Sequence, residues 1–159
     1  MKITVLCVGK IKEKFYRDAI AEYEKRLSKY CKLEVVQVQD EKTIDGASQV
    51  EEEKIKQKEA ERIRKYWKED AYKIALAIEG KMLDSVDLSD KINRLGIAGK
   101  SHIIFIIGGS LGLDEKLLKD VDYLLSFSKM TFPHQLMRVI LLEQIYRSYR
   151  IIAGEPYHK

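Results

Sequence analysis

The sequence predicts an α/β fold in which a mostly parallel sheet is covered by helices on both faces. Short apolar runs typical of buried strands alternate along the chain with longer stretches typical of helices, as in parallel sheets with helical crossovers. Two of the runs, residues 74–78 and 103–107, are continuously apolar, which indicates strands buried on both sides. With 159 residues, 45% of them hydrophobic and 34% charged, the chain is expected to form one domain over residues 1–159.

The first half of the chain is predicted to contain three strands and two helices. The apolar run at residues 3–8 predicts the first strand, and the stretch at residues 12–30 predicts the first helix. A second strand is expected at residues 33–39 and a second helix at residues 47–67. Acidic and basic residues nearly balance around the second helix, which indicates a solvated face. The third strand is expected at residues 72–79.

Cap residues mark the helices of the second half. Ser85 and the polar residues after it are expected to cap the third helix, which Gly96 and Gly99 end. Asp114 suits the first turn of a fourth helix, where a carboxylate meets the positive helix end. Pro133 is expected at the start of the last helix, where its missing N–H leaves no hydrogen bond unmade. The predicted strands here are residues 102–107 and 123–128, and the predicted helices are residues 85–95, 114–118 and 134–152.

The last predicted helix is apolar around nearly its whole circumference. A helix that covers one face of a sheet needs only a single apolar stripe. We therefore expect this helix to be buried on two sides, one of them against a second subunit. Glu143, Arg147 and Arg150 are polar exceptions, and at about 3.6 residues per turn they fall on one narrow ridge.

Composition excludes several classes of protein. No apolar run is long enough to span a membrane, and residues 2–8 lack the cleavage site of a signal peptide. Cys7 and Cys31 are the only cysteines, and we expect reduced thiols in a cytoplasmic protein. No Cys or His pair has the spacing of metal ligands, so no metal site is expected. The net charge of +4, with five basic and two acidic residues from Lys129 onward, favours an anionic partner.

A glycine-rich turn, Gly108 to Gly112, follows one of the continuously apolar strands. Its glycines do not have the spacing of a dinucleotide-binding loop, and no acidic residue ends the next strand to bind a ribose. It also lacks the Gly-Lys-Ser/Thr of a Walker loop. Two interpretations stay open: a tight strand-to-helix turn, or a loop whose missing side chains let the backbone approach a ligand.

A second candidate loop, Phe127 to His134, precedes the last helix. Both loops are expected at one edge of the sheet, where open α/β sheets bind their ligands. His134 is either a cap residue or a general base, whereas His102 opens an apolar strand and is expected to be structural. The chain ends in Pro-Tyr-His-Lys at 156–159, which is either a disordered end or an aromatic and basic segment suited to RNA.

Three motifs together resemble one known family. They are Gly-Gly-Ser-Leu-Gly-Leu at 108–113, Thr-Phe-Pro-His-Gln-Leu-Met-Arg-Val-Ile-Leu-Leu-Glu-Gln-Ile-Tyr-Arg at 131–147, and Pro-Tyr-His-Lys at 156–159. The chain resembles, over its whole length, the RlmH family, the bacterial 23S rRNA pseudouridine N3-methyltransferases of the SPOUT superfamily. This resemblance implies a SPOUT-type fold with a C-terminal trefoil knot, S-adenosylmethionine as cofactor, and a homodimer that modifies 23S rRNA in the ribosome.

The resemblance also implies site residues. The family's cofactor positions map onto Leu76, Gly108, Phe127, Ser128, Lys129, Met130, Thr131 and Phe132. The catalytic candidates are Arg147, His158 and His134, and no general base can be assigned among them. Substrate contacts are expected from Arg138, Arg150, Tyr157 and Lys159, with the tail supplied by the partner subunit.

Two other functions are weaker alternatives. A catalytically idle, knotted ribosome-binding or assembly factor would not need the retained cofactor and tail residues. A nucleotide-binding module that does not act on RNA is disfavoured by the glycine spacing.

Overall fold

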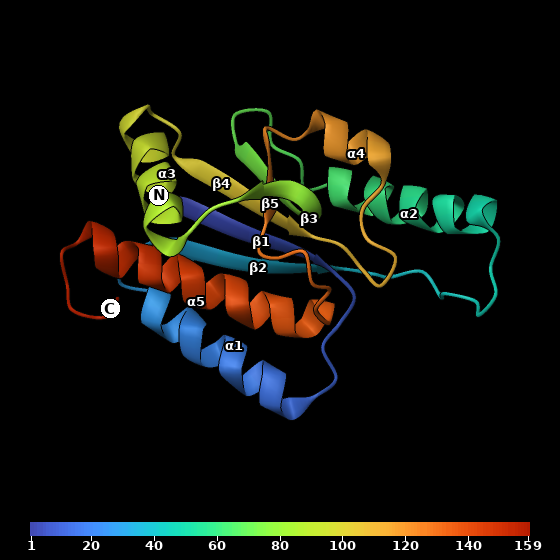
Figure 1. The fold of residues 1–159 in the computed structure, drawn as a ribbon, viewed down its shortest axis with the longest axis horizontal. Helices are drawn as coiled ribbons and strands as arrows, with labels where there is room; N and C mark the ends of the chain where they lie inside the picture. Colours follow the sequence, from blue (N-terminus) through green and yellow to red (C-terminus); the bar gives the residue numbers. More distant parts are fainter.

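Five parallel strands form a single sheet in the computed structural model, which describes residues 1–159 (Figure 1). The strand order is β2-β1-β4-β3-β5. The strands are β1 (Lys2–Val8), β2 (Lys32–Val38), β3 (Tyr72–Met82), β4 (His102–Ile107) and β5 (Tyr123–Ser126). The helices are α1 (Lys14–Leu27), α2 (Gln49–Arg64), α3 (Ser85–Ile97), α4 (Glu115–Asp120) and α5 (His134–Ile152). The predicted α/β class, the parallel sheet and the order of the elements are confirmed.

Helices on both faces of the sheet create two apolar cores. Helices α1, α3 and α5 pack on one face, and α2 and α4 pack on the other (Figure 1). Successive residues of β4 enter opposite cores: Phe105 lies on the α5 side, whereas Ile104 and Ile106 lie on the α2 side. Because neither face of β4 meets water from Ile103 to Ile107, every position of that run is apolar, whereas the run in β3 is buried only at its start and Ile78 is 48% exposed.

The helix ends follow the prediction with two corrections. Helix α3 runs through Gly96 to Ile97 and ends before Gly99, so only the second of the two predicted glycines marks its end. Asp84, rather than Ser85, caps α3, because its carboxylate accepts a hydrogen bond of 2.7 Å from a backbone N–H of the first turn. Asp114 caps α4 in the same way, at 3.3 Å. Pro133 stands directly before α5, as expected.

Strand β3 runs past its predicted end and bends across the edge of the sheet. It pairs with β5 as far as Leu76, and the pairing resumes at Lys81 after a shift in register. Gly80 lies so close to β5 that a Cβ atom there would be 2.7 Å from the backbone of Leu124. Only glycine fits without movement of the chain. The bend brings residues 77–79 to the wall of a pocket.

His102 is confirmed as a structural residue, because its Nε2 forms a hydrogen bond of 2.8 Å with the hydroxyl of Thr4. Cys7 and Cys31 are free thiols. No helix combines the length and the apolar character needed to cross a membrane.

Candidate active site

A pocket of about 740 Å³ opens at the carboxyl ends of β3, β4 and β5, next to the start of α5. Of the predicted cofactor residues, those that line it are Leu76, Gly108, Phe127, Ser128, Met130, Thr131 and Phe132. Lys129 does not line it. The two loops that the sequence singled out therefore meet at one edge of the sheet, as expected for an open α/β fold.

The glycine turn forms the floor of this pocket by folding back on itself. Gly109 and Gly112 pair as an isolated bridge, and the N–H of Gly112 donates to the carbonyl of Gly109 at 3.1 Å. A Cβ atom on Gly108 would lie 2.8 Å from the backbone carbon of Gly112. The interpretation of the motif as a tight turn is confirmed. The turn lines the pocket, and contact of its backbone with a ligand stays a prediction.

Internal hydrogen bonds hold the second loop. The hydroxyl of Ser126 donates to the carbonyl of Ser128 at 3.1 Å, and the hydroxyl of Ser128 accepts from the N–H of Met130 at 3.0 Å. The Met130 side chain is 72% exposed at the rim of the pocket. A ligand in the pocket would meet a loop held by its own hydrogen bonds, with one exposed apolar side chain at the rim.

His134 is the first residue of α5 and lines the pocket. The helix start has no side-chain cap hydrogen bond, so the interpretation of His134 as a cap is wrong. Its Nδ1 is buried without a partner. Burial, and next the positive charge of Arg138, lower the pKa of His134, while Asp40 and Glu13 oppose this shift. At neutral pH the imidazole is therefore uncharged and keeps a ring nitrogen that can accept a proton.

Glu59 on α2 is a residue that the sequence did not single out. Its side chain is buried behind the glycine turn, where one oxygen accepts from the N–H of Glu41 at 2.9 Å. The other oxygen lies 3.4 Å from the place of a Cβ on Gly109. Burial raises the pKa of Glu59. The sequence placed it on a solvated face; its spacing to the apolar Ile63 on the same helix side was the available signal.

Arg138 is buried, which contradicts its predicted contact with a substrate. Only 1% of the residue is exposed, and its guanidinium donates to the carbonyls of Val8 and Gly9 at 2.9 and 2.7 Å. A third hydrogen bond, of 2.9 Å, goes to the side chain of Gln37. Arg138 therefore ties α5 to the ends of β1 and β2 and supports the pocket from behind.

Replacing Arg138 by alanine is expected to lower the free energy of unfolding by about 2 kcal/mol or more, because two buried carbonyls lose their donor at about 1 kcal/mol or more each. Urea unfolding measures this change. The matched control is Arg94→Ala, which removes an 80% exposed arginine paired with Asp90 on α3. The control is expected to cost about 0.5 kcal/mol or less. Equal losses in the two variants would contradict the structural role of Arg138.

The tail residues form a second cluster on α5, built around the carboxylate of Glu143. One oxygen of Glu143 accepts from Arg147 at 2.6 and 3.0 Å and from the hydroxyl of Tyr157 at 3.0 Å. The guanidinium of Arg147 lies 4.7 Å from the centre of the Tyr157 ring, and that ring packs edge-on against Tyr146. The interpretation of the tail as a disordered end is therefore wrong.

The protonation states in this cluster follow from its hydrogen bonds. Burial, together with the hydrogen bond to Glu143, raises the pKa of Tyr157 to about 12, so the phenol stays protonated. The bond to Glu143 also raises the pKa of Arg147. Arg147 lies 3.1 Å from Nδ1 of His158, and because a guanidinium only donates, this nitrogen accepts. His158 then offers an N–H at Nε2, which makes it a donor in this arrangement.

Arg150 fixes the tail to the body of the protein. Its guanidinium donates to Glu155, to the hydroxyl of Tyr30 and to the carbonyl of Pro156. This differs from the predicted contact of Arg150 with a substrate, since the guanidinium is already engaged. Lys159 is exposed, and its ammonium forms no salt bridge.

The pocket and the tail cluster lie toward opposite ends of α5. Met137 lines the pocket, and Arg147 follows ten residues later in the same helix. At a rise of 1.5 Å per residue the two positions are about 15 Å apart. The candidate residues therefore fall into two groups, and one copy of the chain does not bring His158 to the pocket. No group of three or more His, Cys, Asp or Glu residues is placed to hold a metal ion.

Comparison with known proteins gives a consistent result. The sequence family described as "Predicted SPOUT methyltransferase" matches residues 1–158. The "Ribosomal RNA large subunit methyltransferase H" of Bifidobacterium adolescentis is 69% identical over 159 residues, and the protein of that name from Clostridium novyi is 60% identical; both alignments cover 100% of each chain. A solved "probable methylase family protein" from Haemophilus influenzae has a TM-score of 0.56 at 14% identity. The structural match covers 99% of this chain and 70% of the Haemophilus influenzae chain, and it shows a likeness of fold alone.

Proposed function

The chain belongs to the SPOUT methyltransferase family, and from this premise we propose that it methylates N3 of a pseudouridine in 23S rRNA, using S-adenosylmethionine. The names of the relatives at 60–69% identity support a substrate in the large ribosomal subunit. We further propose that a large and already shaped substrate, the assembled ribosome in the cytoplasm, supplies the specificity.

The pocket is the observation that carries this proposal. Its walls combine apolar side chains such as Leu76 and Leu125 with the open backbone of Gly108 and of the loop at residues 127–132. Apolar walls with a few fixed polar groups are the usual surroundings of a cofactor of this size. When bound there, S-adenosylmethionine supplies an electrophilic methyl group, and no metal is needed for its transfer.

The side chains around the pocket suit the remaining tasks. The N3 proton of the pseudouridine must leave, and His134 lines the pocket with an imidazole that is uncharged at neutral pH. Arg147 and His158 offer N–H donors that can orient the base and stabilise negative charge on it, and Tyr157, whose hydroxyl donates to Glu143, offers its ring beside them. These donors lie about 15 Å along α5 from the pocket of their own chain.

We therefore propose a homodimer in which the tail of one subunit serves the pocket of the other. Leu136, Ile140 and Ile151 support this arrangement, because they are half-buried yet pack against neither core. They share one side of α5 with Arg147. The close crossing of β3 and β5 at Gly80 is compatible with the C-terminal trefoil knot that we also propose for this fold.

Ile140→Glu is expected to convert the dimer into a monomer at micromolar concentration. An unpaired carboxylate buried in an interface costs on the order of several kcal/mol, and a two-fold axis doubles that cost. Light scattering after gel filtration measures the mass. Ile145→Glu is the contrasting variant, since Ile145 is fully buried in the core and its replacement should unfold the chain itself. A monomeric wild-type protein, or a folded Ile140→Glu variant that stays dimeric, would count against the proposal.

Nucleoside mass spectrometry of 23S rRNA tests the function directly. Cells that lack the gene should lose N3-methylpseudouridine, and the purified protein with S-adenosylmethionine should restore it on their ribosomes. An unchanged nucleoside profile would reject the proposed reaction. If the protein still bound ribosomes, it would be the non-catalytic factor instead.

A further inference from the structure

The connection between β1 and α1 carries an exposed aromatic ring beside two free positive charges. Phe15, at the start of α1, is 66% exposed. Lys10 and Lys12 precede it, both are exposed, and neither takes part in a salt bridge. The site described above uses none of these three side chains, and the Phe15 ring packs only on the ring of its neighbour Tyr16, 4.3 Å away between centroids.

Hydrogen bonds and packing fix this connection in place. Ile11 is buried in the core, and its N–H donates to the side chain of Gln37 at 3.3 Å. The carbonyl of Gly9 accepts from the buried Arg138 at 2.7 Å. Because Ile11 points inward, Lys10 and Lys12 on either side of it are held outward. The lysines are therefore presented by a rigid segment.

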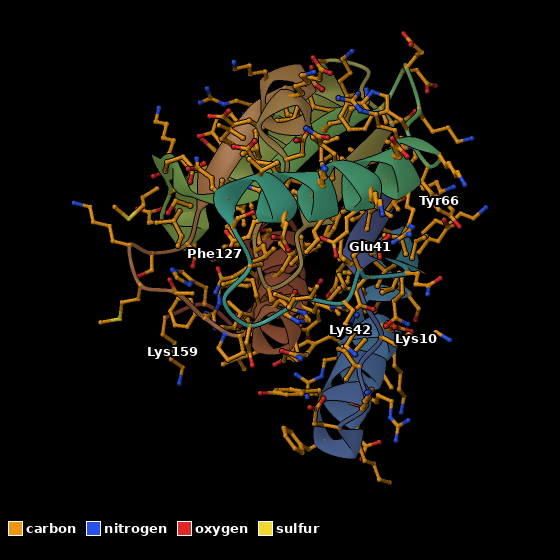
Figure 2. The ribbon with its side chains drawn as sticks, turned by 90° about the vertical axis from the view of Figure 1, so that its right-hand side faces the viewer. Lys10, Glu41, Lys42, Tyr66, Phe127 and Lys159 are labelled. Carbon is orange, nitrogen blue, oxygen red and sulfur yellow. The ribbon has the colours of Figure 1, made fainter.

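The connection lies next to the pocket. A Cβ atom on Gly9 would be 3.9 Å from Cε1 of His134, which lines the pocket, and Lys10 is the next residue. The same position on Gly9 would be 3.8 Å from the side chain of Asp40, so the loop after β2 is also adjacent. Figure 2 labels Lys10 above the helix α1.

We propose that Lys10, Lys12 and Phe15 form a docking surface for the single-stranded RNA that flanks the methylated nucleotide. The lysines would bind phosphates of the strand, and the Phe15 ring would stack on an unpaired base. Exposed aromatic rings next to cations are the usual means of binding single-stranded RNA. This inference rests on the proposed function and adds to it a surface outside the pocket and the tail.

The turn between α2 and β3 provides a matched control. Tyr66 there is 44% exposed, and Lys65 and Lys68 beside it are exposed and free of salt bridges. It thus repeats the composition of the proposed surface. This turn precedes β3, whereas Lys10 follows β1. In a parallel sheet the turn therefore lies at the amino ends of the strands and Lys10 lies at their carboxyl ends.

The experiment measures methylation of ribosomes from cells that lack the gene, and binding of a fluorescent single-stranded oligouridylate, at several salt concentrations. Phe15→Ala should raise the KM for ribosomes at least about fivefold, the lower limit for a lost base stack. Lys10→Ala/Lys12→Ala should weaken binding and reduce the salt slope by about one per lysine. Phe15→Tyr should restore binding, because it restores the ring. Melting temperature and cofactor affinity should not change.

Tyr66→Ala and Lys65→Ala/Lys68→Ala should behave as wild type in both assays. Equal effects at the two surfaces, or none at either, would overturn the proposal while leaving the proposed function intact. Loss with ribosomes but not with oligouridylate would indicate contact with a ribosomal protein and would also overturn it. The proposal would also be overturned if the wild-type protein bound phosphatidylglycerol vesicles and Phe15→Ala abolished this binding without changing the methylation of ribosomes. If the wild-type protein modified no ribosomes, that result would instead reject the proposed function. The oligouridylate measurements would then still test whether Lys10, Lys12 and Phe15 bind single-stranded RNA.

Discussion

Gly108→Val is expected to abolish the binding of S-adenosylmethionine. The first atom of any side chain at this position would lie 2.8 Å from the backbone carbon of Gly112 and 3.0 Å from its carbonyl oxygen. The turn must open to accept it, and the backbone groups that face the pocket then move. The loss arises within the protein itself, before any clash with a ligand. Titration calorimetry with S-adenosylmethionine measures it.

Gly96→Ala is the control for this substitution. Gly96 lies inside α3, and a Cβ atom there meets only the end of the Met1 side chain at 3.5 Å. Alanine favours a helix over glycine by up to about 1 kcal/mol, so this variant should be as stable as wild type or more so. It should bind the cofactor normally. If a folded Gly108→Val protein bound S-adenosylmethionine normally, the glycine turn would not be part of the cofactor site.

Deleting residues 157–159 is expected to reduce methylation of ribosomes by at least about a hundredfold while the pocket keeps its affinity for S-adenosylmethionine. The deletion removes the phenol and the imidazole that Arg147 and Glu143 hold in place. Because the Tyr157 ring packs against Tyr146, some stability is also lost, on the order of 1 kcal/mol for an aromatic pair. The measured rate must therefore be compared at a temperature where both proteins are folded.

Two single variants separate chemistry from packing in the tail. Tyr157→Phe keeps the ring on Tyr146 and loses only the hydroxyl that donates to Glu143. Lys159→Ala removes an exposed charge and is expected to have the smallest effect. A truncated protein that methylates ribosomes at the wild-type rate would refute the role of the tail, and His134 would become the remaining candidate.

The fold could be predicted because its signals are local. Strand β4 was expected to be central, since a run of consecutive apolar residues such as Phe105 and Ile106 is typical of a strand covered by helices on both faces. The two loops of the pocket could be predicted by the same reasoning, because Gly108 and Phe127 come directly after the parallel strands β4 and β5. Residue type and position along the chain were sufficient for these inferences.

The roles of individual charged residues could not be predicted in this way. Arg138 and Arg147 are both arginines on one helix, yet one is buried behind β1 while the other faces the tail. Their difference depends on which side of α5 meets the sheet, a fact that an all-round apolar helix conceals. Glu59 escaped notice for a similar reason, since a buried carboxylate in a highly charged helix resembles its solvated neighbours.

Helix α5 joins the pocket wall at His134 to the tail cluster at Arg147 without a break. Any change in the length of this segment would act on both places at once. One inserted residue would turn the tail by about 100° and shift it by about 1.5 Å relative to the pocket. Insertions and deletions between these two positions should therefore abolish methylation, whereas the loop at residues 39–48 should tolerate them. Helix α5 thus fixes the spacing between the pocket and the tail cluster, and natural variants of this protein should keep its length unchanged.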